Sequence, residues 1–273
     1  MLEVIGHALY NQVQNPVFGR QHLGITPGGP QDNFAYQCGN ILLDNENGAP
    51  ALEIIQASKI IFHEALYFVL TGAARNASLN ETKIEHGLVT KANKNDVLTF
   101  TKTNYGFRTY LCYTNKSDTC LERRLRGSFN AIARWQSPSK KIRVVEGPEY
   151  KYLRNPKNFF DYTWRTTNKI SSMGMHLERP EVELELTNQV EMISEAVADG
   201  TVQLTPQGPL VLLRHRQTIG GYPRIFNVIS ADVDMLAQYG PQSLIQFQKV
   251  TMTKANNVLR QQQKDLKDLK ARF

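Results

Sequence analysis

The residues most suited to chemistry lie between positions 214 and 224, in the run RHRQTIGGYPR. Arg214, Arg216 and Arg224 bring three permanent cations to one stretch, and each guanidinium is a planar donor fork that matches a carboxylate or a phosphate. Gly220 and Gly221 can take φ > 0 and can let a ligand approach the main chain. The run predicts an anion site, although a surface hairpin with solvated arginines has the same composition.

Two apolar runs must position these residues. Residues 210–213 and 225–229 are rich in aliphatic, β-branched and aromatic side chains, which predicts a buried strand on each side of the arginines. Pro223 restricts Tyr222 to extended geometry. Asp232 follows the second strand, where an acid serves either in proton transfer or, more commonly, as a helix cap.

A second candidate segment is punctuated by glycine and proline between residues 19 and 32. It carries Arg20, His22, the pair Gly28-Gly29 and, at its end, Asp32. Asp32 is a suitable N-cap for a helix from residue 33 to about 43, whose free N–H groups could meet an anion. An ordinary junction between a loop and a helix explains the same pattern.

The remaining pattern is mostly that of short strands broken by Gly, Asn and Asp, which favours a barrel or a sandwich. We expect strands at 51–55, 59–62, 66–71, 97–100, 109–113, 142–146 and 181–186, and a helical stretch at 150–160. Residues 252–273 place apolar side chains at three- and four-residue spacing, which predicts an amphipathic helix with one polar interruption at Gln262.

The net charge of +7 is concentrated at the C-terminal end of the sequence, where residues 249–273 hold seven Lys/Arg against two Asp. The rest is nearly neutral, so we expect no nucleic-acid partner. The basic helix is expected to pack on the body or on another protein of the same system. The alternative is a membrane-surface or RNA-binding helix.

Localisation and metal chemistry follow from what the sequence lacks. No apolar run approaches the roughly 20 residues of a membrane span, and the first residues show no cationic signal region. We therefore expect a cytoplasmic protein without a membrane partner. Cys38, Cys112 and Cys120 have no CxxC spacing, which fits reduced thiols, and no motif proposes a metal.

The run RQTIGGYPR, followed by VISAD, resembles the C-terminal signature of a family that contains the C subunit of 5-oxoprolinase. The family is also called the biotin-dependent carboxyltransferase or allophanate hydrolase subunit 2 family. Arg20, His22 and Asp32 match the spacing of its N-terminal pattern. The resemblance implies a mostly β protein with two cyclophilin-like β-barrel domains, short helices and a C-terminal helix. We expect an N-terminal barrel at 1–136, a second barrel at 142–250 and the helix at 251–273.

The resemblance also implies a function, namely one component of an ATP-dependent hydrolase that opens 5-oxo-L-proline to L-glutamate. The implied partners are the B-like and the A-like subunits of the same enzyme system, and the implied cofactor is ATP. The catalytic candidates are Asp32, Arg216 and Asp232. The candidates for binding substrate or ATP are Arg20, His22, Gly28, Gly29, Gln203, Gln217, Thr218, Gly220, Gly221, Tyr222 and Arg224.

Several departures from the family pattern keep two other functions open. Asn15 replaces an acid, Ser172 and His176 stand where two arginines are usual, and His215 replaces an aspartate, while a loop between residues 114 and 136 is shortened. One alternative is a non-catalytic regulatory protein that antagonises a kinase inhibitor. The other is a carboxyltransferase half-site of a biotin-dependent enzyme similar to urea carboxylase. This chain has no biotinyl lysine, so the carrier would come from another chain.

Overall fold

The computed structural model describes residues 1–57, 59–116, 141–179, 181–182, 184–187 and 192–272. The chain forms two compact units. Unit 1 comprises Met1–Asn15, Asp32–Pro138 and Lys264–Phe273, and unit 2 comprises Pro16–Gln31 and Ser139–Gln263. Segment 16–31 thus belongs with the second unit, although it precedes the first helix. Cys120 and nearly all of the expected linker at 136–141 lie outside the described residues.

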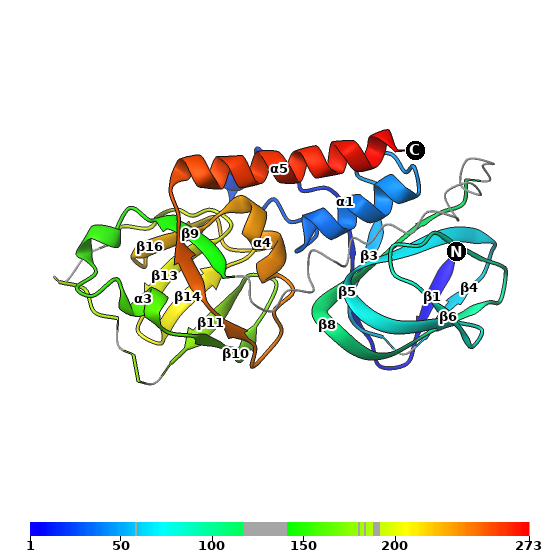
Figure 1. Ribbon diagram of the computed structural model, residues 1–273, viewed down its shortest axis with the longest axis horizontal. Coiled ribbons are helices and arrows are strands. Elements are labelled where there is room, and N and C mark those ends of the chain that lie inside the picture. Colours follow the sequence, from blue (N-terminus) through cyan, green and yellow to red (C-terminus); the bar gives the residue numbers. More distant parts are fainter. Residues whose placement is uncertain (58, 117–140, 180, 183, 188–191, 273) are drawn as a thin grey trace. The chain divides into compact units, whose positions relative to one another are not determined.

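Unit 1 is built on one eight-stranded antiparallel sheet (Figure 1). Its central strands β5 and β8 are long, and they merge three of the expected strands into one paired ribbon. Strands also form near the N-terminus, where the residue pattern indicates none. The strands are β1 (Leu2–Ile5), β2 (Leu9–Val13), β3 (Ala51–Gln56), β4 (Lys59–Phe62), β5 (Leu66–Leu79), β6 (Thr82–Ile84), β7 (Thr90–Ala92) and β8 (Val97–Thr114).

Helix α1 (Asn33–Leu42) covers one face of this sheet (Figure 1). Successive residues of a strand point to opposite faces, and the core divides accordingly: Val69 packs with the helix, whereas Phe68 packs on the other face. The expected N-cap is confirmed, because the Asp32 carboxylate accepts a hydrogen bond from Ala35 N at 2.9 Å.

Unit 2 is a nearly closed barrel with strand order β17-β10-β11-β14-β13-β16-β9-β18. The edge strands β17 and β18 are one residue apart in sequence, so the two ends of the sheet meet. The strands are β9 (Ile142–Glu146), β10 (Trp164–Ile170), β11 (Gly174–Glu178), β13 (Thr201–Thr205), β14 (Gly208–Leu212), β16 (Arg224–Val228), β17 (Leu244–Ile245) and β18 (Phe247–Lys249). Phe159 stacks on Phe226 inside the barrel, with ring centroids 4.6 Å apart. The expectation of a mostly β, two-barrel protein is confirmed.

Short elements complete unit 2. A two-stranded ribbon joins β12 (Glu195–Ala196) to β15 (Ile219–Gly220). The helices are η1 (Gln21–Leu23), η3 (Tyr150–Tyr152), α3 (Asn158–Asp161) and α4 (Ser230–Leu236). The expected helical stretch at 150–160 is therefore split in two. The expected strand at 181–186 is wrong for the described residues, where only Leu186 pairs, in an isolated bridge to Leu153.

The predicted C-terminal helix is α5 (Met252–Ala271), and the structure explains its polar interruption. The Gln262 side chain is 6% exposed, and its Nε2 donates a hydrogen bond to Asp234 Oδ2 at 2.7 Å. Leu269, in the last turns of the helix, is buried in the core of unit 1. Gln262 is thus a satisfied buried amide on the apolar face of the helix.

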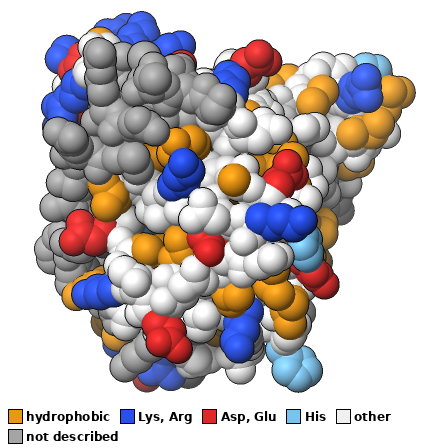
Figure 2. Space-filling view, turned by 90° about the vertical axis from the view of Figure 1, so that its right-hand side faces the viewer, with side chains coloured by type: hydrophobic (Ala, Val, Ile, Leu, Met, Phe, Trp, Pro, Cys, Tyr) orange, Lys and Arg blue, Asp and Glu red, His pale blue; other side chains and the backbone are white. Residues whose placement is uncertain are grey.

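The described part of the chain contains no helix long and apolar enough to cross a membrane. On the surface drawn in Figure 2, basic and acidic side chains are interspersed with hydrophobic ones over the described residues.

Candidate functional site

The motif loop, residues 213–224, leaves β14 and returns to the barrel at β16. Its first arginine is held by acids. Arg214 Nη2 donates to Asp234 Oδ1 at 2.6 Å, and Arg214 Nη1 lies 3.4 Å from Asp199 Oδ2. Arg216 Nε lies 3.0 Å from the other oxygen of Asp199. Both guanidinium groups therefore fix the shape of the loop through ion pairs.

Arg224 is engaged in the same way at the other end of the loop. Its Nε and Nη2 reach the two oxygens of Glu149, each at 2.9 Å, and Nη2 also lies 2.6 Å from Glu195. Burial raises the pKa of Glu149, but its hydrogen bonds and charge interaction with Arg224 outweigh burial and lower it overall. Arg214 and Arg216 share Asp199, and Arg224 pairs with Glu149, in place of the single cationic cradle suggested by the sequence.

Segment 16–31 docks on the start of the motif loop. Thr26 donates to the carbonyl of Arg214 at 3.1 Å, and His215 Nε2 donates to the carbonyl of Gly29 at 2.8 Å. Gln31 accepts at its carbonyl from Arg214 Nε at 3.1 Å. His215 therefore joins two loops through its ring.

The other predicted residues of segment 16–31 lie away from these joining bonds. Arg20 and His22 are exposed around η1. Gly28 and Gly29 adopt φ of 66° and 94°, in the left-handed region that favours glycine. The structure thus brings the two predicted loops together through Thr26, Gly29 and Gln31, two of which the sequence analysis did not select.

Gly220 is required for close packing. Neither Gly220 nor Gly221 has a positive φ, which corrects the expectation of left-handed geometry at this pair. A Cβ on Gly220 would lie 2.5 Å from Gln203 Nε2. Gln203 is fully buried, and its Nε2 donates to the carbonyl of Tyr222 at 3.4 Å. Gly220 therefore leaves space for the Gln203 side-chain amide, which holds the loop through its hydrogen bond to Tyr222.

The predicted residues next to these glycines have different partners. Gln217 Nε2 is 3.5 Å from Gln203 Oε1, and the Thr218 carbonyl accepts a hydrogen bond from Val197 N at 3.1 Å. Tyr222 is 45% exposed. The motif loop thus presents an aromatic ring outward while its amides lie against the barrel.

The two acids proposed for catalysis have structural partners. Asp232 accepts from Arg143 Nε at 2.9 Å and Arg143 Nη2 at 2.6 Å, and it is 1% exposed. It does not cap α4, whose N-cap is Ile229, so the expected capping role is wrong. Asp32 belongs to unit 1, where it is fully buried at the start of α1. A catalytic role for Asp32 or Asp232 stays a prediction, and the burial and existing partners of both carboxylates do not favour it.

Two hollows of unit 2 border the motif loop. The Tyr222 hollow, of about 550 Å³, has no charged side chain among its described lining residues: Leu184, Leu186, Thr187, Met192, Leu204, Thr205, Pro206, Gly221, Tyr222 and Pro223. The His176 hollow, of about 330 Å³, is lined by Lys169, Ile170, Ser171, Met173, Gly174, His176, Leu210, Leu212 and Gln217. The motif loop therefore contributes to an apolar hollow through Tyr222 and to a polar one through Gln217.

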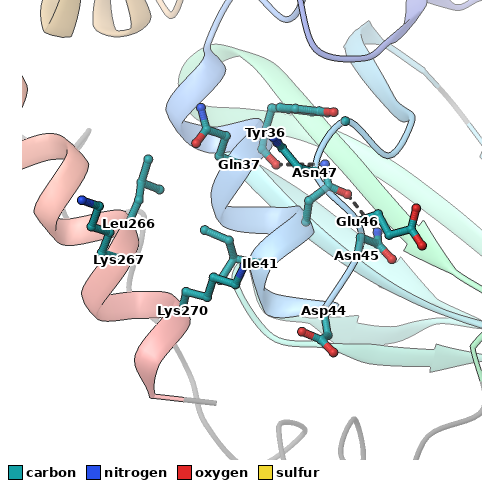
Figure 3. A pocket seen from close by; sticks show the side chains of 12 residues that line it. Tyr36, Gln37, Ile41, Asp44, Asn45, Glu46, Asn47, Leu266, Lys267 and Lys270 are labelled. Carbon is teal, nitrogen blue, oxygen red and sulfur yellow. Dashed lines mark hydrogen bonds between the residues drawn. The ribbon is translucent and has the colours of Figure 1, made fainter.

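Unit 1 has a hollow of its own, of about 270 Å³ (Figure 3). Lys267 and Lys270 of α5 border it together with Asp44 and Glu46, which follow α1. The hydroxyl of Tyr36, which lines this hollow, already has a partner, because Tyr36 Oη donates to the carbonyl of Ala49 at 2.7 Å. The described lining carries charges of both signs, so this hollow gives a weaker signal for a charged ligand.

Sequence reasoning missed Glu149, Asp199 and Lys169. Glu149 and Asp199 hold the arginines of the motif loop, and Lys169 borders the His176 hollow. Burial raises the pKa of Asp199, and the charges of Arg216 and Arg214 only partly oppose that effect. None of the three lies within the motif or belongs to a recognisable local pattern. Their proximity to the motif loop becomes visible only once the strand pairing is known.

Comparisons with known proteins agree with the resemblance seen in the motifs. The chain is 28% identical over 278 residues to the C subunit of 5-oxoprolinase from Haemophilus influenzae, with 89% of each chain covered. It is also 28% identical over 304 residues to the protein of the same name from Escherichia coli, with 98% of this chain and 97% of the other covered. That alignment is longer than the 273 residues of this chain, so it contains gaps in this chain.

The fold has a counterpart among solved structures. The K. lactis urea amidolyase matches with a TM-score of 0.84 at 18% identity, over 98% of this chain and 20% of that much longer one. The family model for the carboxyltransferase domain, subdomain A and B, matches residues 23–121 and 115–249. The chain is therefore a member of the carboxyltransferase domain, subdomain A and B, family.

Proposed function

We propose that this chain is one component of an ATP-dependent 5-oxoprolinase-type enzyme, which opens 5-oxo-L-proline to L-glutamate together with its B-like and A-like subunits. The observation that carries the proposal is the similarity to two proteins named as the C subunit of 5-oxoprolinase, which extends over nearly the whole of this chain and of its relatives. A cytoplasmic location follows from this role and stays part of the proposal.

The chemistry requires activation of a poor electrophile. ATP would supply that activation, because a phosphoryl group on the amide oxygen makes the ring carbon electrophilic enough for water to add. The C–N bond then breaks as the nitrogen takes a proton, and a second water releases phosphate from the acyl phosphate to leave the free acid. The residues of this chain bind and orient the substrate. Gln217, which borders the His176 hollow, is supported by Gln203. Asp199 and Glu149 hold the arginines of the loop in fixed positions.

The described residues of unit 2 do not fit ATP by themselves. Arg214, Arg216 and Arg224 are each paired with a carboxylate, so their guanidinium charge is already compensated. A triphosphate would have to displace those acids at a considerable cost in free energy. We therefore assign the nucleotide mainly to a partner protein, and no catalytic step here is drawn through it.

The test is ATP-dependent release of glutamate from 5-oxo-L-proline by this chain mixed with its candidate partner proteins, with each component omitted in turn. We expect activity only in the full mixture. An Arg216→Ala variant should lose at least about tenfold in kcat/KM, because Asp199 would lose its 3.0 Å partner and keep only the 3.4 Å contact with Arg214. An assembled wild-type complex without activity would contradict the proposal.

The family description favours one alternative, a carboxyltransferase half-site. A separate biotinylated carrier would then be required, so biotin-dependent carboxyl transfer to urea, measured with such a carrier protein, distinguishes the two enzymes. A regulatory protein would instead bind its partner without supporting either reaction.

A further inference from the structure

The His176 hollow offers hydrogen-bond donors and no acid. Its described lining contains neither Asp nor Glu. Lys169 contributes an ammonium group, and Ser171 Oγ accepts a hydrogen bond from Met173 N at 3.1 Å, so that its O–H can still donate. A hollow whose polar groups are donors without a compensating carboxylate suits an anion.

His176 supplies an independent observation that points to a ligand in this hollow. Its Nδ1 atom is buried and has no hydrogen-bond partner among the residues that the structure describes. Burial, followed by the charge of Lys169, lowers the pKa of His176. The ring is therefore neutral near pH 7 and holds one N–H donor. A buried polar atom costs free energy unless it is paired. Because Nδ1 is closed to solvent in this structure, a ligand atom in the hollow would pair it once the ring turns toward the hollow.

The wall of the hollow next to His176 and Gly174 is apolar and tightly packed, because Leu210 pairs with His176 and Leu212 with Gly174 across neighbouring strands. Leu212 is 1% exposed, and Leu210 lies beside it on the same strand. A Cβ on Gly174 would lie 2.8 Å from the carbonyl oxygen of Val211 and 3.2 Å from Leu210 Cδ1. The volume of about 330 Å³ admits a molecule of a few carbon atoms. The apolar wall favours an organic acid over an inorganic anion.

We propose that the His176 hollow binds the carboxylate of a small cyclic amide acid. Lys169 faces the carboxylate charge, the His176 ring donates one hydrogen bond to it, and the hydrocarbon edge of the ring packs on Leu210 and Leu212. The identity of the acid as 5-oxo-L-proline rests on the proposed function. Carboxylate binding itself rests only on the hollow.

Gln217 connects this hollow to the motif loop. It lines the hollow, and through Gln203 it is joined to the carbonyl of Tyr222, with bonds of 3.5 Å and 3.4 Å. A carboxylate held by Lys169 therefore leaves the amide of the same ligand within the part of unit 2 that the motif loop borders. Lys169 and His176 act in this arrangement as specificity-determining residues.

The test uses the full chain with ¹⁵N-labelled histidine. The ring resonance of His176, identified by its loss in His176→Gln, is followed while 5-oxo-L-proline is added. We expect a saturable shift that 2-pyrrolidinone, the same ring without the carboxylate, does not produce. Lys169→Met should weaken binding about 10- to 100-fold, the range of a charge-assisted hydrogen bond. Lys151→Met, which removes an exposed lysine beside Tyr152, should leave it unchanged.

Two results would overturn the assignment of the hollow. One is the lack of a saturable shift in the wild-type chain, and the other is a dissociation constant that Lys169→Met leaves unchanged. Inorganic phosphate that binds as tightly as 5-oxo-L-proline would show that the hollow is a general anion site and would reject the carboxylate assignment.

The glutamate-release assay separates this proposal from the proposed function. A saturable shift without activity in the assembled complex would reject the enzyme and retain the hollow. Normal activity with an unchanged KM in both Lys169→Met and His176→Gln would reject the hollow and retain the enzyme.

Discussion

At the scale of single residues, the motif loop depends on Gly220, where a larger side chain would not fit. Gly220 lies against the buried amide of Gln203, and its backbone needs no left-handed conformation. The adjacent Gly221 is less crowded, since its nearest neighbour to a new Cβ would be Ser194 Oγ at 3.3 Å. The two consecutive glycines look alike in the sequence, but only Gly220 is needed to avoid a close contact with a buried side chain.

We expect Gly220→Ala to destabilise the chain by about 1–3 kcal/mol, the usual cost of overpacking a filled site. The displaced Gln203 should also raise KM for 5-oxo-L-proline. Gly221→Ala is the matched control and should change both quantities much less. Thermal unfolding together with the glutamate-release assay checks this. Equal effects of the two substitutions would show that the packing against Gln203 is unimportant.

At the scale of elements, the Glu149–Arg224 pair joins η3 to the first residue of β16. The backbone takes part as well, because Glu149 N donates to the carbonyl of Arg224 at 3.2 Å and Arg224 N donates to Glu149 Oε2 at 2.9 Å. The side chains are 11% and 13% exposed. This pair fixes where the motif loop ends and the barrel resumes.

The lowered pKa of Glu149 predicts an acid-sensitive contribution to stability. For a carboxyl group with a depressed folded-state pKa, the contribution is present above the unfolded value of about 4.3 and is lost as the pH falls through the folded value. Glu149→Gln should therefore cost about 3 kcal/mol at pH 7. The difference from wild type should shrink below about pH 4.

Urea unfolding at pH 7 and at about pH 3.5 measures this difference. Glu195→Gln is the control, because Glu195 is the other partner of Arg224 but is 56% exposed, so its loss should cost less than about 1 kcal/mol. A Glu149→Gln penalty that stays constant with pH would contradict the assignment.

At the scale of the whole molecule, each unit has its own hydrophobic core. Phe159 lies at the centre of the aromatic cluster of unit 2, where it also contacts Trp164 with ring centroids 5.5 Å apart. In unit 1, Phe68 stacks on Phe62 at 5.2 Å. The two cores share no residue among those described.

Phe159→Ala should lower the stability reported by Trp164 fluorescence by about 3–5 kcal/mol. The sequence has two tryptophans, so a Trp135→Phe background leaves Trp164 as the only reporter. We expect Phe68→Ala to affect the Trp164 transition less, since its cavity lies in the other core. Equal shifts from both substitutions would mean that the two units unfold together.

The sequence by itself determined part of the local structure and the family. Asp32 as an N-cap, the amphipathic helix α5 and the strands on each side of the motif loop follow from short-range patterns, because capping and periodicity involve residues close in sequence. The run RQTIGGYPR carried the family for the same reason, since a contiguous motif can be read without the fold.

Only the tertiary structure decided what the arginines and the hollow do. Arg224 finds Glu149 across 75 residues, and strand pairing brings Lys169, His176 and Gln217 to one hollow. Ion pairs and cavities depend on which strands are neighbours, and that order is set by long-range packing that no local pattern encodes. The three arginines therefore looked like an anion cradle in the sequence, whereas in the fold acids compensate them and the uncompensated donors lie at the His176 hollow.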